Sequence, residues 1–382
     1  MRQALIAVLI LCWMPQLSDA MSYFSADAPV ASQSVSDRKK ASADALEQVL
    51  IRVSGITDLS SVPALAKAKR APERFVQQFS FKANPQPDES AQILSVSFSP
   101  TGIKGLLRQA GLPFWPLNRP NALVWLAEDS ATEGRQIVTD PLNPVLAGLL
   151  DVANLRGIPL TLPLMDLQDQ LAVGPDQIWA LEEESIALAS ERYNTDTILV
   201  GKYSVTSTGS ILSTWQYVHR NVRRSLDFRT QDLSLTGAKA VNALADHLSG
   251  LYAVRANSGV NGRAFFVEVT QIFDYQDFDA MLMYLKNLAL VDQLQLNRTL
   301  DDKVYLNVTL KGDESQLENA LALDGRLKLL PAPFQAVNQR TLAGISSTIG
   351  LDPSSGPEIQ QSATLPQQML PTLRFEWVHT RL

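Results

Sequence analysis

The side chains that could bind a metal or act as general acids and bases are few and scattered. His219 lies at the end of a predicted strand, His247 on a predicted helix and His379 in the C-terminal tail. None has a second histidine or a carboxylate at the helical i, i+4 spacing that zinc sites commonly use. We therefore expect no metal site, and we interpret His247, beside Asp246, as a surface or half-buried residue.

Short motifs typical of catalysis or binding each depart from their pattern. Residues 344–348 (Gly-Ile-Ser-Ser-Thr) lack the second glycine of the turn that presents a hydrolase serine. Residues 102–105 (Gly-Ile-Lys-Gly) have the spacing of a nucleic-acid clamp loop, but they fall in the first turn of a predicted helix. The glutamates at 182–184 point about 100° apart on a helix, so they cannot share one substrate. We therefore expect no catalytic, cofactor-binding or metal-binding residue, and no cofactor.

The tryptophans show no arrangement that would indicate sugar stacking. They are spread over strands, one helix and a connector, which predicts core or interdomain packing. Those after residue 20 are Trp115, Trp125, Trp179, Trp215 and Trp377.

The first twenty residues read as a secretory signal peptide, which we expect to be cleaved after Ala20. Arg2 supplies the basic start, residues 4–14 the apolar core and residues 18–20 the small residues before the cut. The apolar run is shorter than the roughly 20 residues of a membrane-spanning helix. An uncleaved anchor is the alternative, whereas lipid attachment at Cys12 is rejected because a bulky leucine precedes it. We expect a periplasmic protein with no membrane span in its mature chain.

The charge of the chain argues against nucleic acid and anionic membranes as partners. The net charge is −6, and residues 1–20 carry one basic and one acidic residue, so their removal leaves it unchanged. The basic clusters at 38–40 and around 220–224 are interpreted as solvated edges of helices or strands. Cys12 is the single cysteine, so a chain cut after Ala20 has no disulfide and no thiolate ligand. The fold must then be stabilised by the burial of apolar side chains in a core, for which a hydrophobic content of 46% is sufficient.

The pattern of apolar residues predicts an N-terminal α+β domain at 21–118. A helix over 36–55 begins at Ser36 as N-cap and ends at Gly55. A proline-rich connector at 112–120 sets the boundary. Further predicted elements are strands at 74–82 and 93–98 and a helix at 100–110.

A central α/β domain is predicted at 119–256, with the order β-α-β-α-β-β-β-α. Its clearest helix begins at Asn143 and ends before Gly157 and Pro159. The other elements are strands at 123–126, 158–165, 197–201, 211–218 and 226–229, and helices at 175–193 and around 241–251.

A joint at 257–262 leads to a C-terminal β-α-β-β-α domain at 263–330, a small two-layer module. Its predicted strands cover 265–269, 291–296 and 303–310, and its helices 275–288 and 314–323. Residues 331–382 are predicted to be a flexible tail with a final strand at 373–378. That strand either docks on this chain or pairs with the sheet edge of a partner.

Several short motifs occur in a fixed order along residues 36–330. They are Ala-Leu at 45–46 and Val-Leu-Ile-Arg-Val-Ser-Gly at 49–55, Arg119-Pro120 with Leu-Val-Trp-Leu at 123–126, Arg-Gly-Ile-Pro at 156–159, Pro-Leu-Met-Asp at 163–166, Ala-Ser-Glu-Arg-Tyr at 189–193, the run 196–201, the Trp215 strand and Tyr-Ala-Val at 252–254. The series resembles the exported bacterial family known as domain of unknown function 2066. The resemblance implies a Gram-negative envelope protein of gammaproteobacterial type with no assigned activity. The middle domain looks loosely like the N-terminal domain of the Tol-Pal propeller protein.

These observations favour a non-enzymatic periplasmic accessory protein that contacts an envelope protein partner. Interdomain grooves, exposed sheet edges and the strand at 373–378 are the expected contact surfaces. The alternative is a periplasmic hydrolase or small-molecule-binding protein whose site is assembled from distant segments. Asp166, Arg192, Asp196 and His219 are examples of residues that could converge in such a site.

Overall fold

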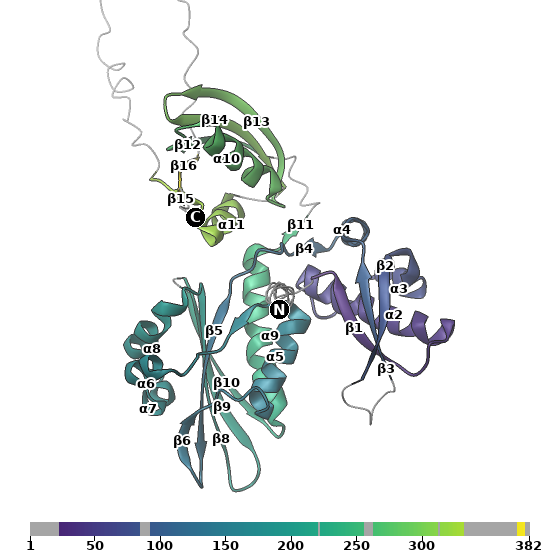
Figure 1. Ribbon diagram of the computed structural model, residues 1–382, viewed down its shortest axis with the longest axis vertical. Helices are drawn as coiled ribbons and strands as arrows, with labels where there is room; N and C mark the ends of the chain where they lie inside the picture. Colours follow the sequence, from purple (N-terminus) through teal and green to yellow (C-terminus); the bar gives the residue numbers. More distant parts are fainter. Residues whose placement is uncertain are drawn as a thin grey trace, which may run out of the picture. The chain divides into compact units, whose positions relative to one another are not determined.

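The computed structural model describes residues 23–84, 92–220, 222–255, 263–311, 314–331 and 373–378. It divides into two compact units, with the division between Ser258 and Gly259 (Figure 1). Both units contain helices packed on β-sheets, which confirms the predicted mixed α/β and α+β class. The predicted signal peptide at 1–20, the joint at 257–262 and most of the tail lie outside the described residues. No helix among the described residues is long and apolar enough to cross a membrane.

The first half of unit 1 is a three-stranded antiparallel sheet with a long helix against it. The strand order is β1-β3-β2. The elements are β1 (Ser25–Val30), α2 (Val35–Ser54), α3 (Pro63–Arg70), the 3-10 turn η1 (Pro72–Arg74), β2 (Val76–Ala83), β3 (Gln92–Phe98) and α4 (Pro100–Gln109). Helix α2 buries the apolar stripe around Leu46 and Leu50 against the sheet. Its N-cap is Ser34 and not the predicted Ser36, because the Ser34 hydroxyl accepts the Asp37 N–H at 3.1 Å.

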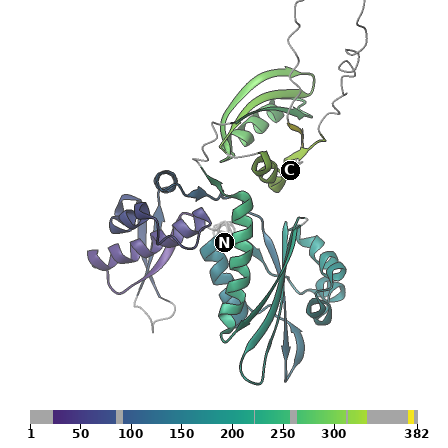
Figure 2. The ribbon, with the colours of Figure 1, turned by 180° about the vertical axis from the view of Figure 1, so that it is seen from behind.

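The second half of unit 1 is a mixed sheet between two helical layers. Its strand order is β10-β9-β8-β5-β6, with β7 beside β5. Helices α5 and α9 cover one face, and α6, α7 and α8 cover the other (Figure 2). The bounds are β5 (Ala122–Ser130), β6 (Gly134–Ile137), α5 (Pro144–Arg156), β7 (Leu160–Thr161), α6 (Leu167–Ala172), α7 (Pro175–Ala180), α8 (Glu183–Ser190), the 3-10 turn η2 (Glu191–Tyr193), β8 (Thr197–Val205), β9 (Ile211–His219), β10 (Val222–Thr230) and α9 (Leu233–Tyr252).

Two predicted elements of this half are wrong in extent. The single helix predicted over 175–193 is interrupted, because Leu181 has a left-handed backbone with φ of 55° and ends α7. The strand predicted over 158–165 is only the two residues of β7. In contrast, α5 has both predicted caps, Asn143 and Gly157.

Buried arginines join the two halves of unit 1 where helices α2 and α5 end. The Arg119 guanidinium donates to the carbonyl oxygens of Arg52, Arg156 and Gly157 at 2.8–2.9 Å. It also lies 4.0 Å from the centre of the Trp115 ring. These carbonyls would otherwise lack donors at the helix C-termini, so the arginine satisfies both helix ends at once.

Two further arginines and a short strand pair extend this join. Arg52 donates to Asn154 O at 2.9 Å, and Arg156 donates to Gly55 O at 3.0 Å and to Asp246 at 2.7 Å. Strand β4 (Pro113–Phe114), within the proline-rich connector, pairs with β11 (Val254–Arg255) after α9. The predicted partition at 118 and 256 into separate domains stays a prediction.

Unit 2 is a five-stranded sheet with helices on one face, and the chain's last described strand lies inside it. The strand order is β13-β14-β12-β16-β15. The elements are β12 (Arg263–Thr270), α10 (Tyr275–Asn287), β13 (Val291–Leu300), β14 (Lys303–Leu310), α11 (Glu314–Asp324), β15 (Leu327–Leu329) and β16 (Leu373–Trp377). Strand β16 pairs parallel with β12 and antiparallel with β15. Of the two alternatives predicted for this strand, docking on its own chain is the one that the structure shows.

Candidate functional site

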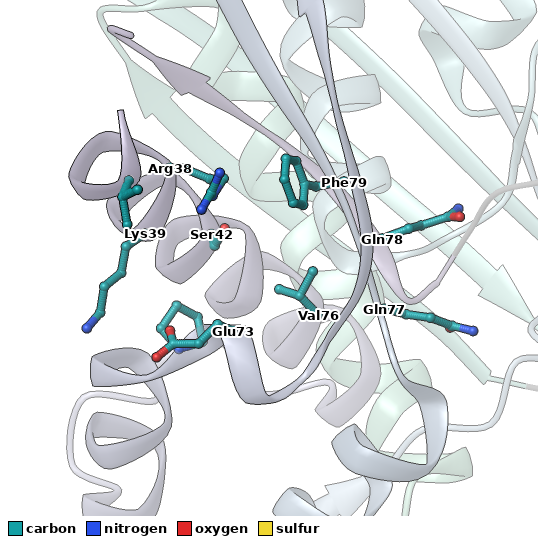
Figure 3. Close-up of a pocket in the computed structure, with 10 residues that line it drawn as sticks. Arg38, Lys39, Ser42, Glu73, Val76, Gln77, Gln78 and Phe79 are labelled. Atoms are coloured by element: carbon teal, nitrogen blue, oxygen red, sulfur yellow. The ribbon is translucent and has the colours of Figure 1, made fainter. Parts of the chain in front are cut away.

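A groove lies in unit 1 between helix α2 and the edge strand β2 (Figure 3). Its volume is about 730 Å³. Among the described residues β2 pairs only with β3, so its other edge is free for a further strand. The lining comes from α2, η1 and β2 and comprises Val35, Arg38, Lys39, Ser42, Pro72, Glu73, Val76, Gln77, Gln78 and Phe79. We name these residues the β2 groove.

Aromatic and cationic side chains define the β2 groove. The Arg38 guanidinium lies 4.9 Å from the centre of the Phe79 ring, and the two side chains point toward each other in Figure 3. Phe79 remains 46% exposed and Val35 70% exposed, although both are apolar. A cation over an aromatic face keeps the guanidinium positioned while its N–H donors stay available.

The charge of the groove is positive on its helix side. Arg38 and Lys39 form no ion pair with any described residue, whereas nearby lysines on other surfaces do, such as Lys69 with Glu47 at 2.6 Å. Glu73 is the acidic side chain of the lining. The arrangement offers main-chain pairing along β2, an apolar contact at Phe79 and two cations for a carboxylate, which suits an extended acidic segment.

The sequence indicated this groove only in part. The basic cluster at 38–40 was interpreted as a solvated edge, and the structure places Arg38 and Lys39 in the groove and leaves Lys40 outside its lining. Phe79 gave no signal, because its position at a sheet edge depends on strand order, which no local pattern reveals. The strand β2 itself was predicted within two residues of its observed bounds.

Two of the residues suggested for a convergent site, Asp166 and Arg192, do meet. The Arg192 guanidinium donates to both Asp166 carboxylate oxygens at 2.7 and 2.8 Å and to Asp169 at 3.0 Å. Asp169 is fully buried and also accepts the Tyr193 hydroxyl and the Met165 N–H. Sequence reasoning missed Asp169 and Tyr193.

The electrostatics of this cluster show groups that satisfy one another. Hydrogen bonds from Arg192 lower the pKa of Asp166 to about 2. The hydrogen bonds to the Asp166 carboxylate in turn raise the pKa of Arg192. Burial, followed by the hydrogen bond to Asp169, raises the pKa of Tyr193. An acid held ionised and a phenol held protonated are poorly suited to transfer protons at neutral pH. The cluster instead fastens α6 to η2.

The other two suggested residues form a separate contact at the end of β9. His219 is buried, and its Nδ1 lies 3.2 Å from the Asp196 carbonyl oxygen and 2.8 Å from the Thr197 hydroxyl. Its Nε2 lies 2.7 Å from the Tyr252 hydroxyl. Burial lowers the pKa of His219 to about 4, so the ring is neutral at pH 7. The four suggested residues therefore meet in two pairs and not in one site.

Other candidates stay apart in the described chain. His247 is half-buried, as predicted, with its ring 6.4 Å from that of His219. Trp115, Trp125 and Trp215 are buried in the core, which confirms their predicted packing role. No group of three or more histidine, cysteine or acidic side chains with metal-binding geometry occurs among the described residues. His379 lies outside them.

Comparison with known proteins matches part of the chain to a family without an assigned function. Residues 19–116 match the model of domain of unknown function 8605. No curated protein matches. Among solved structures, the C-terminal domain of LpoB from Salmonella enterica is 14% identical, with a TM-score of 0.22 over 30% of this chain and 83% of that one. An uncharacterized protein is 11% identical, with a TM-score of 0.15 over 35% of this chain and 91% of that one.

The family match corrects the resemblance drawn from short motifs. The model that matches is domain of unknown function 8605 and not 2066, and it covers the segment that contains the β2 groove. The loose likeness of the middle domain to the Tol-Pal propeller protein was part of the same motif-based resemblance, and it is wrong with it. Short motifs such as a capped helix or a Gly-Ile-Pro turn recur wherever the same local geometry is needed, so their order was less specific than expected.

Proposed function

We propose that this chain is a non-enzymatic accessory protein of the periplasm that binds an envelope protein through the β2 groove. The observation that carries the proposal is an edge of β2 that no described strand covers, beside an exposed Phe79 and two cations that form no ion pair with a described residue. Long exposed edges invite strand pairing, and proteins that do not use them usually cover or interrupt them. The predicted signal peptide supports the periplasmic location.

The partner that fits the groove is an extended segment with an acidic side chain. Its main chain would add a strand next to β2, one apolar side chain would contact Phe79, and a carboxylate would bind Arg38 and Lys39. A bidentate carboxylate–guanidinium pair supplies both energy and register. The acidic net charge of the rest of the chain makes a cationic groove the place where an acidic partner is attracted.

In-cell photo-crosslinking tests this proposal at single positions. A photoreactive residue at Val35, which is exposed on the rim, should give a discrete adduct, and the crosslinked peptide of the partner should be extended and acidic. Arg38→Glu should reduce the adduct about tenfold, since it reverses the charge that binds the carboxylate. Lys40→Glu makes the same change of charge outside the lining and should leave the adduct intact.

The purified partner peptide then decides between docking and chance proximity. Its affinity for the Arg38→Glu chain should fall by about tenfold or more relative to the Lys40→Glu chain, and the difference should shrink at high salt. An equal adduct from a photoreactive residue at the distant Gln136, or equal loss with both glutamate variants, would count against the groove as the contact.

A further inference from the structure

The last strand of unit 2 occupies an internal position of its sheet, although it comes from far along the chain. Val267 to Thr270 of β12 pair with Leu373 to Glu376, and Leu327 to Leu329 of β15 pair with β16 from the other side. Strand β16 thus fills a slot between β12 and β15. Without it these two strands would face each other across an open gap in the sheet.

The slot recognises its strand by specific side chains. Leu373, Phe375 and Trp377 alternate along β16 and are at most 6% exposed. On the other face, Arg374 Nε donates to Oε1 of the buried Glu268 at 2.8 Å, and Nη2 lies 2.8 Å from the same oxygen in an ion pair. A buried carboxylate needs such a partner, because an unpaired charge in the interior is strongly unfavourable.

We propose that this slot also takes β16 of a second copy of the chain, so that two copies exchange their last strands. A second copy carries the same alternating side chains and the same arginine, so every contact of the slot is reproduced. Residues 332–372 lie between β15 and β16, and a chain of that length can reach at most roughly 140 Å at full extension. That reach allows the strand to enter the slot of a neighbouring copy.

The long connection also sets the concentration at which exchange occurs. Strands β15 and β16 are antiparallel neighbours. A hairpin turn of a few residues would be enough to connect two such strands. Loop closure becomes less favourable as the loop lengthens, which lowers the effective concentration of the chain's own strand to about millimolar or below. Single copies dominate when the protein is dilute. Exchanged pairs become more abundant as the protein concentration approaches the effective concentration of the chain's own strand. A pair would carry two β2 grooves.

A cysteine pair across β15 and β16 distinguishes a strand in its own slot from one in a neighbour's slot. Lys328 and Glu376 are directly paired in the register. In the full chain with Cys12→Ser, Lys328→Cys and Glu376→Cys should form a disulfide within one chain at about 5 µM. After refolding at about 500 µM, a covalent dimer on a non-reducing gel should be at least about tenfold more abundant.

Mixing two single-cysteine chains removes any ambiguity from refolding. The Lys328→Cys chain and the Glu376→Cys chain, refolded together, should form a mixed disulfide, because their cysteines meet only through exchange. Asp279→Cys on helix α10 replaces Glu376→Cys as the control for random contact and should give a much weaker band. If every disulfide stays within one chain at all concentrations, or the control band is equal, strand exchange is wrong. Neither result bears on the β2 groove, which lies in unit 1.

Discussion

At the scale of single residues, buried polar side chains in unit 1 serve the fold more than chemistry. Arg119 directs its five donors to carbonyl oxygens, and burial lowers the pKa of its guanidinium to about 9, which still leaves it charged at neutral pH. His219 is held neutral between Thr197 and Tyr252. Asp169 is enclosed by donors. Each is a buried polar group whose partners are specific, so each can be tested by removing one side chain.

Replacing Arg119 should weaken the join between the two halves of unit 1. Arg119→Gln leaves several buried carbonyl oxygens without a donor, and we expect the free energy of unfolding to fall by about 3 kcal/mol. Urea unfolding of the chain measures this change. Arg108→Gln on the exposed face of α4 is the matched control and should change stability by less than about 0.5 kcal/mol. Equal urea midpoints for the two variants would show that water replaces Arg119 as the hydrogen-bond donor to these carbonyl oxygens.

His219 should make stability depend on pH in the mildly acidic range. Its pKa is about 4 in the folded chain and near 6.5 when unfolded, so the unfolded state binds a proton first as the pH falls. Stability should be fully present above pH 6.5 and decrease toward pH 4 by about 1.4 kcal/mol per unit. The pKa of His247 is also lowered by burial, which adds to the slope.

Urea midpoints between pH 7.5 and 4.5 measure that dependence. His219→Gln removes the titrating group, so its midpoint should change less with pH than that of the unsubstituted chain, even though it is less stable at pH 7.5. Identical slopes for the two chains would assign the pH dependence to other groups.

At the scale of elements, glycines set how closely helices α5 and α9 approach. A β-carbon at Gly148 would lie 2.2 Å from the Ser234 carbonyl oxygen, and one at Gly237 would lie 2.1 Å from the Val145 carbonyl oxygen. Neither oxygen can move without shifting its backbone. The two glycines therefore fix the distance between helices that together cover one face of the sheet.

The glycines of α9 allow a matched comparison within one helix. Gly237→Ala should destabilise unit 1 by several kcal/mol, because the methyl group forces the helices apart. A β-carbon at Gly250 would meet no neighbouring atom within 4 Å. Gly250→Ala should therefore stabilise the helix by up to about 1 kcal/mol, because alanine has the higher helix propensity. Thermal unfolding of the two variants checks the opposite signs. Two variants of similar stability would mean that α9 can shift at no cost.

Prediction from the sequence succeeded where the information is local. Helix α5 has an N-cap, a first-turn proline and a C-cap glycine, and its bounds were predicted correctly. Strand β1 was missed, because Ser-Ala-Asp-Ala-Pro-Val contains a proline and small residues and becomes a strand only by pairing with β3. The helix predicted over 175–193 failed because Leu181 adopts a left-handed conformation, which a non-glycine residue rarely does and which no pattern in the sequence indicated.

The candidate site was less predictable than the fold. The strand that contains Phe79 and the basic residues at 38–40 were visible separately, but their proximity depends on the order β1-β3-β2. Asp166 and Arg192 were named as two of four residues that could converge in one site, but they meet only each other and the buried Asp169, which carried no signal in the sequence. Contacts between residues far apart in the sequence decide whether Phe79 lies near the basic residues at 38–40, whether Asp166 meets Arg192 and where Asp169 lies. A single sequence contains little information about such contacts.

At the scale of the whole molecule, the C-terminal strand is part of the fold and not an appendage. A chain ending at Pro331 would lose Leu373, Phe375 and Trp377 and would leave Glu268 without Arg374. No described strand of unit 2 pairs with a strand of unit 1, so the damage should stay within unit 2. A truncation at this point therefore removes an internal strand of the sheet as well as the connection, and it is unsuitable for mapping a partner.

Hydrogen exchange read by mass spectrometry separates these effects by region. In the chain truncated after Pro331, peptides from 263–331 should lose protection, while those from 23–255 keep it. An internal deletion of 335–368 retains β16 and a shorter connection, so protection in 263–311 should be preserved. Because the shorter connection raises the effective concentration of the chain's own strand, this deletion should also suppress exchange between copies. Lost protection in the internal deletion would instead show that the connection itself stabilises the sheet.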